Sequence, residues 1–199
     1  MKKSPYNAEI SAGSLLVRES QRIAKLLIKG VDEQGWHKAV IVDNVLQKKS
    51  PPSAKRMARL VRNRLELMTP DLWKLVASGS SEVATQALLA TSIKHSHLLG
   101  DFMKDVIRDH WRTYNKQLSA RDWTDYFEEC EHRDRSLGDL SESTKRKLGQ
   151  VVFRILAEAK YIDSTRKMNL LPHRIIPEIY RYLVDNNEKY VLRCMEIGQ

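Results

Sequence analysis

The chain has 199 residues, 42% of them hydrophobic, so one large domain or two small ones with a buried core are expected. Its formal net charge of +9 and pI near 9.6 favour a polyanionic partner. Cys130 and Cys194 are too few for a disulfide framework or a cysteine-based zinc site, and no apolar run approaches the roughly 20 residues of a membrane span. These features exclude a disulfide-rich secreted protein and a membrane-spanning one, and they favour a reduced, cytoplasmic setting.

The charge is distributed unevenly along the chain. Residues 1–100 hold 16 basic and 8 acidic residues, whereas residues 101–199 hold 18 and 17. In the second half, residues 122–142 have a net charge of −6 (8 acids, 2 arginines) and residues 145–174 a net charge of +6 (8 basic residues, 2 acids). We therefore expect distinct charged patches rather than an evenly mixed surface.

Cap residues and apolar spacing predict helices along almost the whole chain. The expected caps are Ser14, Ser53, either Ser80 or Ser81, Ser119 in the pattern Ser119-x-x-Asp122, and either Ser141 or Ser143. Thr69-Pro70 is a further start signal. The expected helices cover residues 14–29, 32–47, 53–68, 69–79, 80–99, 102–116, 119–132, 143–160 and 177–190.

The one strand-like stretch runs from Tyr161 to Leu171 around a polar tip and predicts a short β-hairpin. The expected fold class is therefore all-α, a compact multi-helix protein with helix-turn-helix-like elements and one hairpin wing near 161–171. We expect an N-terminal helical region at 1–118 and a winged-helix-like region at 119–199, or one compact domain overall.

Residues 48–64 carry seven Lys and Arg side chains, and the first acid after them is Glu66. On a helix with about 100° per residue, one face is cationic, and the opposite face is apolar and contains Arg64. We expect Arg64 to snorkel or to pair with a carboxylate. The candidate nucleic-acid contacts are Lys48, Lys49, Ser53, Lys55, Arg56, Arg59, Arg62 and Asn63.

The preceding helix, the Ser50-Pro51-Pro52 turn and this basic helix have the order of a helix-turn-helix, whose second helix enters the major groove. The hydroxyl of Ser53 and free N–H groups near it are expected to hold a phosphate. The alternative is an ordinary solvated amphipathic helix.

A second candidate surface lies in residues 141–174, where a helix with one core stripe and one cationic stripe precedes the expected wing. This order is that of a winged helix, in which the helix reads the groove and the wing contacts the backbone. The alternative is a core helix followed by a hairpin. Gly149, in mid-helix, predicts close approach of another backbone. The candidate contacts are Thr144, Arg146, Lys147, Gln150, Arg154, Arg166 and Lys167.

No motif in the chain predicts catalysis, a cofactor or a metal. There is no glycine-rich phosphate loop, HExxH or GxSxG. The rings of His95 and His97 lie about 200° apart on a helix, which suits a metal poorly. Glu158-x-Lys160 lies at a helix end without the paired strands of a nuclease. The four tryptophans have aliphatic neighbours at helical spacing, so they are expected in the core.

The segment Tyr6-Asn7-Ala8-Glu9-Ile10-Ser11-Ala12-Gly13-Ser14-Leu15 resembles the BrxA family, the small A component of bacterial BREX phage-defence systems. The likeness continues through 48–64 and 155–159. The resemblance implies a cytoplasmic, non-enzymatic, all-helical protein that binds DNA and works beside a methyltransferase and other BREX proteins. It also implies no catalytic residues. The family has been likened to a helical RNA-binding antitermination fold, so RNA stays open as a ligand.

Three functions follow from these observations. The leading hypothesis is binding of duplex DNA through about five or six phosphates, which predicts a salt slope near −5. The second is binding of structured RNA by the same surface. The third is a scaffold in which the acidic residues 122–142 dock a basic patch of a partner. No small-molecule or membrane partner is expected.

Overall fold

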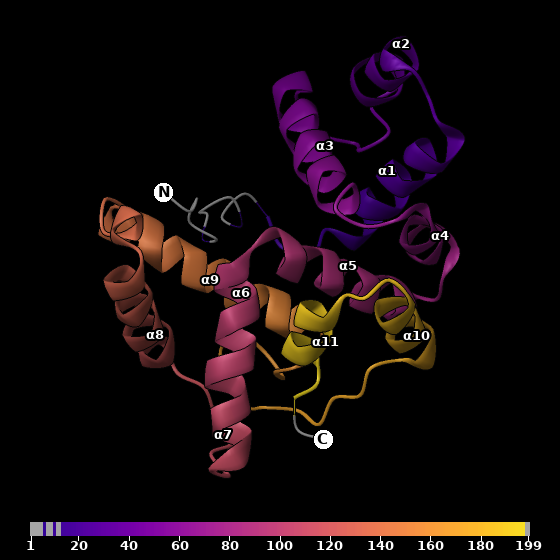
Figure 1. The fold of residues 1–199 in the computed structure, drawn as a ribbon. Helices are drawn as coiled ribbons and strands as arrows, with labels where there is room; N and C mark the ends of the chain where they lie inside the picture. The colour runs from indigo at the N-terminus through magenta and orange to yellow at the C-terminus, as the bar shows by residue number, and fades with distance from the viewer. Residues whose placement is uncertain (1–5, 7–9, 11–12, 198–199) are drawn as a thin grey trace.

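The protein is a bundle of helices, and the computed structural model describes residues 6, 10 and 13–197 (Figure 1). Among these residues no segment forms a strand. Asn7, Ala8, Glu9, Ser11 and Ala12 of the first family-like segment lie outside the described residues. The helices are α1 (Val17–Lys29), α2 (Glu33–His37), η2 (Lys38–Val42), α3 (Pro51–Leu65), α4 (Pro70–Ser78), α5 (Ser81–His95), α6 (His97–Asp101), η3 (Phe102–Ile107), α7 (Arg108–Arg112), α8 (Ala120–Arg133), η4 (Arg135–Leu137), α9 (Glu142–Glu158), α10 (Pro177–Asp185) and α11 (Lys189–Met195).

Helix α5 lies at the centre of the molecule. It packs against α1, α3 and α4 from the N-terminal part of the chain and against α10 and α11 from the C-terminal part. Small side chains such as Ala84, Ala87 and Ala90 are fully buried, so neighbouring helices approach α5 from several sides. One hydrophobic cluster contains residues from before and after position 118. The division into regions 1–118 and 119–199 stays a prediction.

The break after α5 falls at Ser96 and not at Gly100, where it was expected. Ser96 has an extended backbone (φ −134°, ψ 104°), and α6, η3 and α7 then follow as one helical rod (Figure 1). Gly100 lies within α6, and a Cβ at this position would lie only 2.4 Å from the hydroxyl of Tyr190. This glycine therefore serves close packing against α11 and does not end a helix.

Several helix boundaries differ from the predicted ones. Helix α1 starts after Leu16, which is in the left-handed conformation, so Ser14 is not its cap. Helix α3 starts after Ser50, with Pro51 and Pro52 in its first turn, so the prediction of Ser53 as the cap is wrong. The expected helix 32–47 is capped by Asp32 but ends at Val42. The expected helix 177–190 is split into α10 and α11 around Asn187, which has φ 57°.

The predicted hairpin wing is wrong. A single antiparallel bridge joins Ile162 to Leu170, and Tyr161 and Ile162 are both buried, so the side chains do not alternate as in a half-exposed strand. The backbone of 168–170 is also shared with another partner, because Leu118 N donates to Met168 O and Leu170 N donates to Lys116 O. With its hydrogen bonds divided between two neighbours, this segment extends neither pairing into a ladder.

Helix starts at α4 and α8 agree with the sequence signals. Thr69 precedes Pro70 at the first position of α4, and Ser119 and Asp122 form a capping box at α8. Of the four tryptophans, Trp123 is buried, and Trp36, Trp73 and Trp111 are partly buried against the core. No helix in the described part of the chain is long and apolar enough to span a membrane.

Candidate nucleic-acid interface

One side of α3 is an exposed cationic surface. We call the exposed residues Lys49, Lys55, Arg56, Arg59 and Asn63 the α3 surface. Its four cations make no ion pair within the described residues. The opposite side, with Ala54, Ala58 and Leu65, packs against α1 and α5. The helix therefore presents free positive charge to solvent while its apolar face is buried in the core.

Two predicted contacts in this region are already occupied. Lys48 Nζ lies 2.7 Å from Glu19 Oε1, and both side chains are about three-quarters shielded from solvent. Arg62 pairs with Glu66 at 2.7 Å, and its guanidinium lies 4.7 Å from the ring centroid of Trp36. Both cations are therefore already paired within the protein and are not counted among the free positive charges of the α3 surface.

The start of α3 offers fewer phosphate donors than the sequence suggested. Pro51 and Pro52 have no N–H, and Ala54 N already donates to Ser50 O. The hydroxyl of Ser50 donates to that of half-buried Ser53 over 3.1 Å. The loop between η2 and α3 spans residues 43–50, longer than the turn of about three or four residues of a helix-turn-helix.

Arg64 lies on the buried side of α3, as its place in the pattern indicated. It is 3% exposed, and its guanidinium donates to the carbonyl oxygens of Ser14 (2.6 Å) and Gly13 (2.9 Å). Burial lowers the pKa of Arg64 to about 10, and the charge of Glu158 acts in the opposite direction. Its hydrogen-bond partners are thus backbone carbonyls, whereas the sequence predicted a snorkelling side chain or a pair with a carboxylate.

A second cationic surface runs along α9. We call the exposed residues Arg146, Lys147, Gln150 and Arg154, with Arg166 and Lys167 of the loop after α9, the α9 surface. Its five cations also make no ion pair within the described residues. Thr144 is half-buried, and its backbone N–H donates to the capping hydroxyl of Ser141. The loop is closed by Asp163, whose carboxylate accepts from Asn169 N and Nδ2 at 3.0 and 2.8 Å.

Gly149 permits close approach of a side chain rather than of another backbone. A Cβ at this position would lie 2.5 Å from Trp123 Cδ1. The indole N–H of Trp123 donates to Lys145 O, one turn earlier on α9. The glycine thus lets α8 and α9 pack tightly while the cationic side of α9 stays in solvent.

The acidic residues of α8 are partly neutralised by their neighbours. Arg121 pairs with Asp125, and Arg133 pairs with Glu129. Lys145 of α9 pairs with Glu131 at 2.6 Å. Next to these pairs, a groove of about 560 Å³ lies between α8 and α9 and is lined by Trp123, Phe127, Glu128, Phe153 and Met168 among others.

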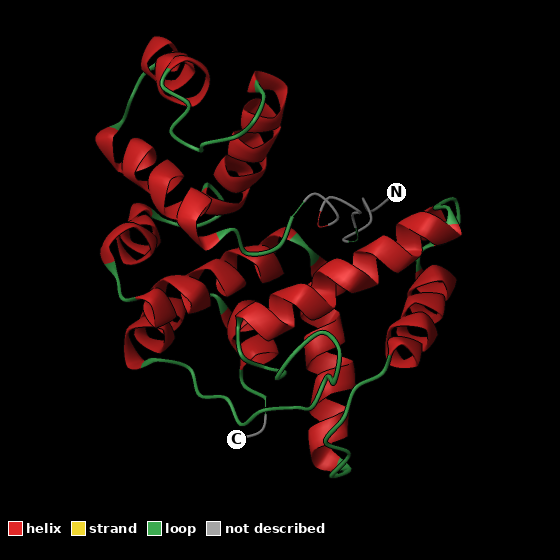
Figure 2. Cartoon of the chain, turned by 180° about the vertical axis from the view of Figure 1, so that it is seen from behind, coloured by secondary structure: helices red, strands yellow, loops and turns green. Residues whose placement is uncertain are grey.

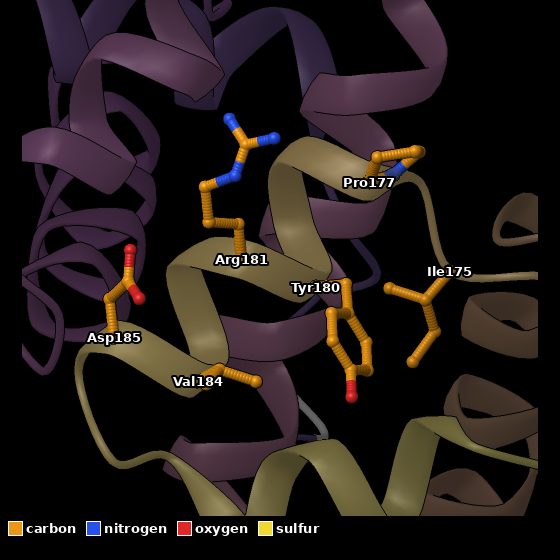
Figure 3. A pocket seen from close by; sticks show the side chains of 6 residues that line it. All are labelled: Ile175, Pro177, Tyr180, Arg181, Val184 and Asp185. Atoms are coloured by element: carbon orange, nitrogen blue, oxygen red, sulfur yellow. The ribbon is translucent and has the colours of Figure 1, made fainter.

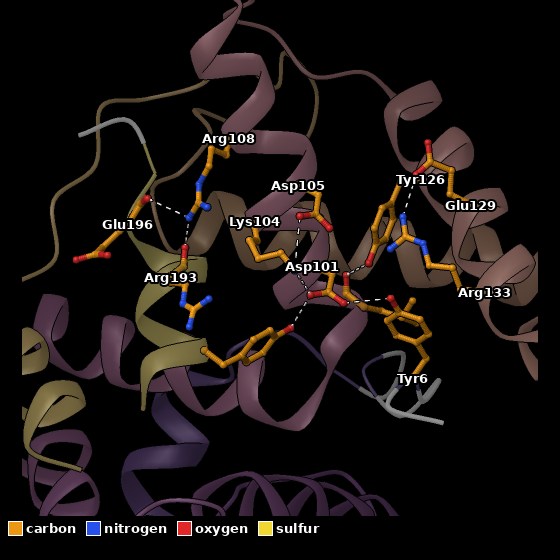
Figure 4. A network of polar contacts seen from close by, with 12 residues as sticks. Tyr6, Asp101, Lys104, Asp105, Arg108, Tyr126, Glu129, Arg133, Arg193 and Glu196 are labelled. Atoms are coloured by element: carbon orange, nitrogen blue, oxygen red, sulfur yellow. Dashed lines mark hydrogen bonds and ion pairs between the residues drawn. The ribbon is translucent and has the colours of Figure 1, made fainter. Parts of the chain in front are cut away.

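Asp101 is a polar centre that the sequence did not reveal. Its carboxylate accepts from the hydroxyls of Tyr6 and Tyr190, each at 3.1 Å, and pairs with Lys104 at 2.8 Å (Figure 4). Ile10 is fully buried. Tyr6 and Ile10 therefore anchor the N-terminal segment to the core.

The cysteines near this centre are not suited to chemistry. Burial raises the pKa of Cys194 to about 12 and also raises that of Cys130, so both thiols are neutral at pH 7.

A shallow pocket of about 460 Å³ lies against α10 (Figure 3). Ile175, Tyr180 and Val184 line it together with one cation, Arg181, and one anion, Asp185. Because one cation and one anion balance each other, the pocket has no preference for a polyanion, and we do not include it in the candidate nucleic-acid interface.

Comparison with known proteins gives a consistent family. The family model named BrxA matches residues 4–187. A "BREX protein BrxA" of Paramagnetospirillum magneticum is 46% identical over the full length of both chains, and one of Escherichia coli O9:H4 is 31% identical over 94% of this chain and 88% of its own. A crystal structure titled as an uncharacterized protein from Magnetospirillum magneticum matches with a TM-score of 0.90 at 45% identity, over 96% of this chain and 98% of that one.

Proposed function

The chain belongs to the BrxA family of BREX proteins, and from this we propose that it is a non-enzymatic component of a BREX phage-resistance system that binds duplex DNA through phosphate contacts. It acts in the cytoplasm beside other BREX proteins. The α3 surface carries this proposal, because four exposed cations stand there without a neutralising acid. Solvated helix faces usually mix the two signs of charge, whereas helices that lie on nucleic acid do not.

Duplex DNA fits these surfaces better than single-stranded nucleic acid does. Proteins that bind single strands stack bases on exposed aromatic rings. The aromatic rings that line the groove beside Arg146 are those of Trp123, Phe127 and Phe153, and all three side chains are buried. Beside the α3 surface, the ring of Trp36 is covered by Arg62. A rigid helix with cations along one side instead matches the regular spacing of phosphates along a duplex.

The test is charge reversal on the α3 surface. Lys55→Glu combined with Arg59→Glu is expected to weaken binding to duplex DNA by about 30-fold or more at moderate salt, because two phosphate contacts become repulsive. Both side chains are exposed, so thermal unfolding should stay within a few degrees of the wild type. Affinity is measured by fluorescence anisotropy with nuclease-treated protein, with hairpin RNA as competitor.

Lys25→Glu with Lys189→Glu is the matched control, since it makes the same change in net charge at exposed sites on α1 and α11. The control should bind nearly as well as the wild type. A folded α3 double mutant with unchanged affinity contradicts the assignment of this surface. Equal or better competition by hairpin RNA makes RNA the ligand. Absence of binding even at low salt leaves the scaffold function in first place.

A further inference from the structure

The C-terminal ends of the two cationic helices both contact residues 13–16, which lie between them. Arg64 is the penultimate residue of α3, and Glu158 is the last residue of α9. Arg64 donates to the carbonyls of Gly13 and Ser14, and Glu158 Oε2 accepts from Leu15 N at 2.9 Å. We call residues 13–16 the strap, because its backbone joins the ends of the two helices.

The strap is held firmly on the side of α3. The Arg64 guanidinium is buried and spends two N–H groups on neighbouring carbonyls of the strap, a fork that only arginine provides. A buried cation costs free energy unless it is well hydrogen-bonded, so these two bonds determine where the strap lies. A Cβ at Gly13 would lie 2.9 Å from Leu16 Cδ1 and 3.3 Å from Leu60 Cδ2, so the strap lies close against α3.

Backbone strain shows that the strap's conformation is imposed by its surroundings. Leu16 has φ 56° and ψ 48°, a left-handed conformation that is unfavourable for a leucine. The preceding residue of the strap, Leu15, is held by α1, because the hydroxyl of Ser20 donates a hydrogen bond to Leu15 O. Contacts from α1, α3 and α9 together therefore fix one geometry of the strap.

From the strap, the two cationic helices diverge. Figure 2 shows their N-terminal ends well apart, with the strap near the point where they approach each other. Helix α3 has 15 residues and α9 has 17, so they extend about 22 and 26 Å from this point. A duplex of about 20 base pairs is about 68 Å long and reaches past both arms, whereas one turn of about 10 base pairs is about 34 Å long.

We propose that the strap sets the angle between α3 and α9, with Arg64 and Glu158 as positioning residues, so that both cationic surfaces hold one duplex. This inference rests on the proposed DNA-binding function. Two surfaces at a fixed angle act on one duplex as linked binding sites, and binding by the second becomes intramolecular. If the bonds from Arg64 and Glu158 to the strap are removed, each cationic surface stays intact, but the two surfaces are no longer held at a fixed angle.

The experiment compares affinities for duplexes of about 10 and about 20 base pairs, one and two helical turns. Glu158→Ala removes the acceptor of Leu15 N at an exposed side chain, and Glu158→Gln keeps an acceptor oxygen there. Arg64→Lys keeps the buried charge but cannot bond both carbonyls in the same way. Glu178→Ala, an exposed acid on α10, is the matched control.

The wild type and Glu178→Ala are expected to bind the longer duplex at least about tenfold more tightly than the shorter one. In Glu158→Ala and Arg64→Lys this advantage is expected to fall to about twofold or threefold, because a longer duplex still offers more positions at which one surface can bind. Affinity for the short duplex is expected to stay unchanged. Glu158→Gln should restore most of the advantage.

Two results overturn the role of the strap. One is a folded Glu158→Ala variant that keeps the full length advantage, and the other is an equal loss of affinity for both duplexes, which marks a general structural defect. Failure of the wild type to bind either duplex overturns the proposed function and the strap's role with it. Binding by the wild type with no effect of the variants overturns the strap alone.

Discussion

His173 is a half-buried histidine whose ring stacks on that of Tyr161, with ring centroids 4.0 Å apart. Its Nε2 lies 3.2 Å from Gln86 Nε2, so it accepts a hydrogen bond in its neutral form. Burial lowers the pKa of His173 to about 4, whereas an unfolded chain binds this proton near pH 6.5. The stability from neutral His173 is therefore complete above pH 6.5 and lost as the pH falls toward 4.

Between pH 7 and pH 5 these two pKa values correspond to about 1.8 kcal/mol of lost stability. Solvent screening at this half-buried ring reduces the expected loss to about 1 kcal/mol, or about 2–4 °C in melting temperature. His173→Phe keeps a stacked ring and removes the titration, so its melting temperature should fall less over this range. His132→Phe, at an exposed position, is the control and should behave like the wild type. Parallel pH profiles for all three proteins would contradict the role given to His173.

Arg64 and Glu158 illustrate what the sequence can predict for single residues. The helical pattern placed Arg64 on the apolar side of its helix, and the structure confirms that it is buried. Its partners, Gly13 and Ser14, lie some fifty positions away, and no local pattern connects them. The sequence singled out Glu158 in the Glu158-x-Lys160 pattern and in the family-like segment 155–159. Neither pattern indicates its bond to Leu15 N, because a bond to a distant backbone N–H leaves no signature in spacing.

At the scale of the helix, local signals located starts better than ends. Pro70 and the Ser119 capping box marked α4 and α8 correctly, because caps act through neighbouring residues. The glycine at position 100 is explained by packing against Tyr190, which is distant in sequence, so no local pattern could show that Gly100 lies within a helix. The hairpin was wrong for the same reason, since residues 116–118 compete for its backbone groups.

The α9 surface gives a prediction at this scale. Arg146→Glu with Arg154→Glu should weaken binding to a duplex of about 20 base pairs by about tenfold or more, because both side chains are exposed and unpaired. Arg121→Glu with Arg133→Glu makes the same change in net charge on the adjacent helix α8. There the arginines already pair with Asp125 and Glu129, so the effect should be much smaller.

Anisotropy titrations at one salt concentration compare these two double mutants. Equal losses would mean that only the net charge matters, and the α9 surface would then be no contact site. The wild-type loop with Arg166 and Lys167 remains in both proteins, so a difference between them reports on the helix itself.

For the whole molecule, the net charge of +9 indicated the class of partner but not the number of free cations. Composition counts every lysine and arginine equally, whereas the fold pairs Lys48, Arg62 and Lys145 with acids. On the two surfaces, this leaves four free cations along α3 and five along α9 and its following loop. The sequence therefore indicates where the two cationic segments lie, but only the folded structure shows which of their lysines and arginines are paired with acids and which are free.

The salt dependence of binding measures how many of these cations meet phosphates. Each contact contributes about −0.9 to the slope of log K against log salt, so the α3 surface alone gives about −4 and both surfaces together give about −8. A slope near −5 corresponds to about five or six contacts, more than the α3 surface offers, and requires α9 to take part. Repeating the salt series with Arg146→Glu and Arg154→Glu should bring the slope from about −5 to about −3, because two of the contacts are lost. An unchanged slope of log K against log salt in this variant would show that the DNA contacts α3 but not α9. Cations that do not contact phosphates release no counterions from the duplex, so removing them leaves the salt dependence unchanged.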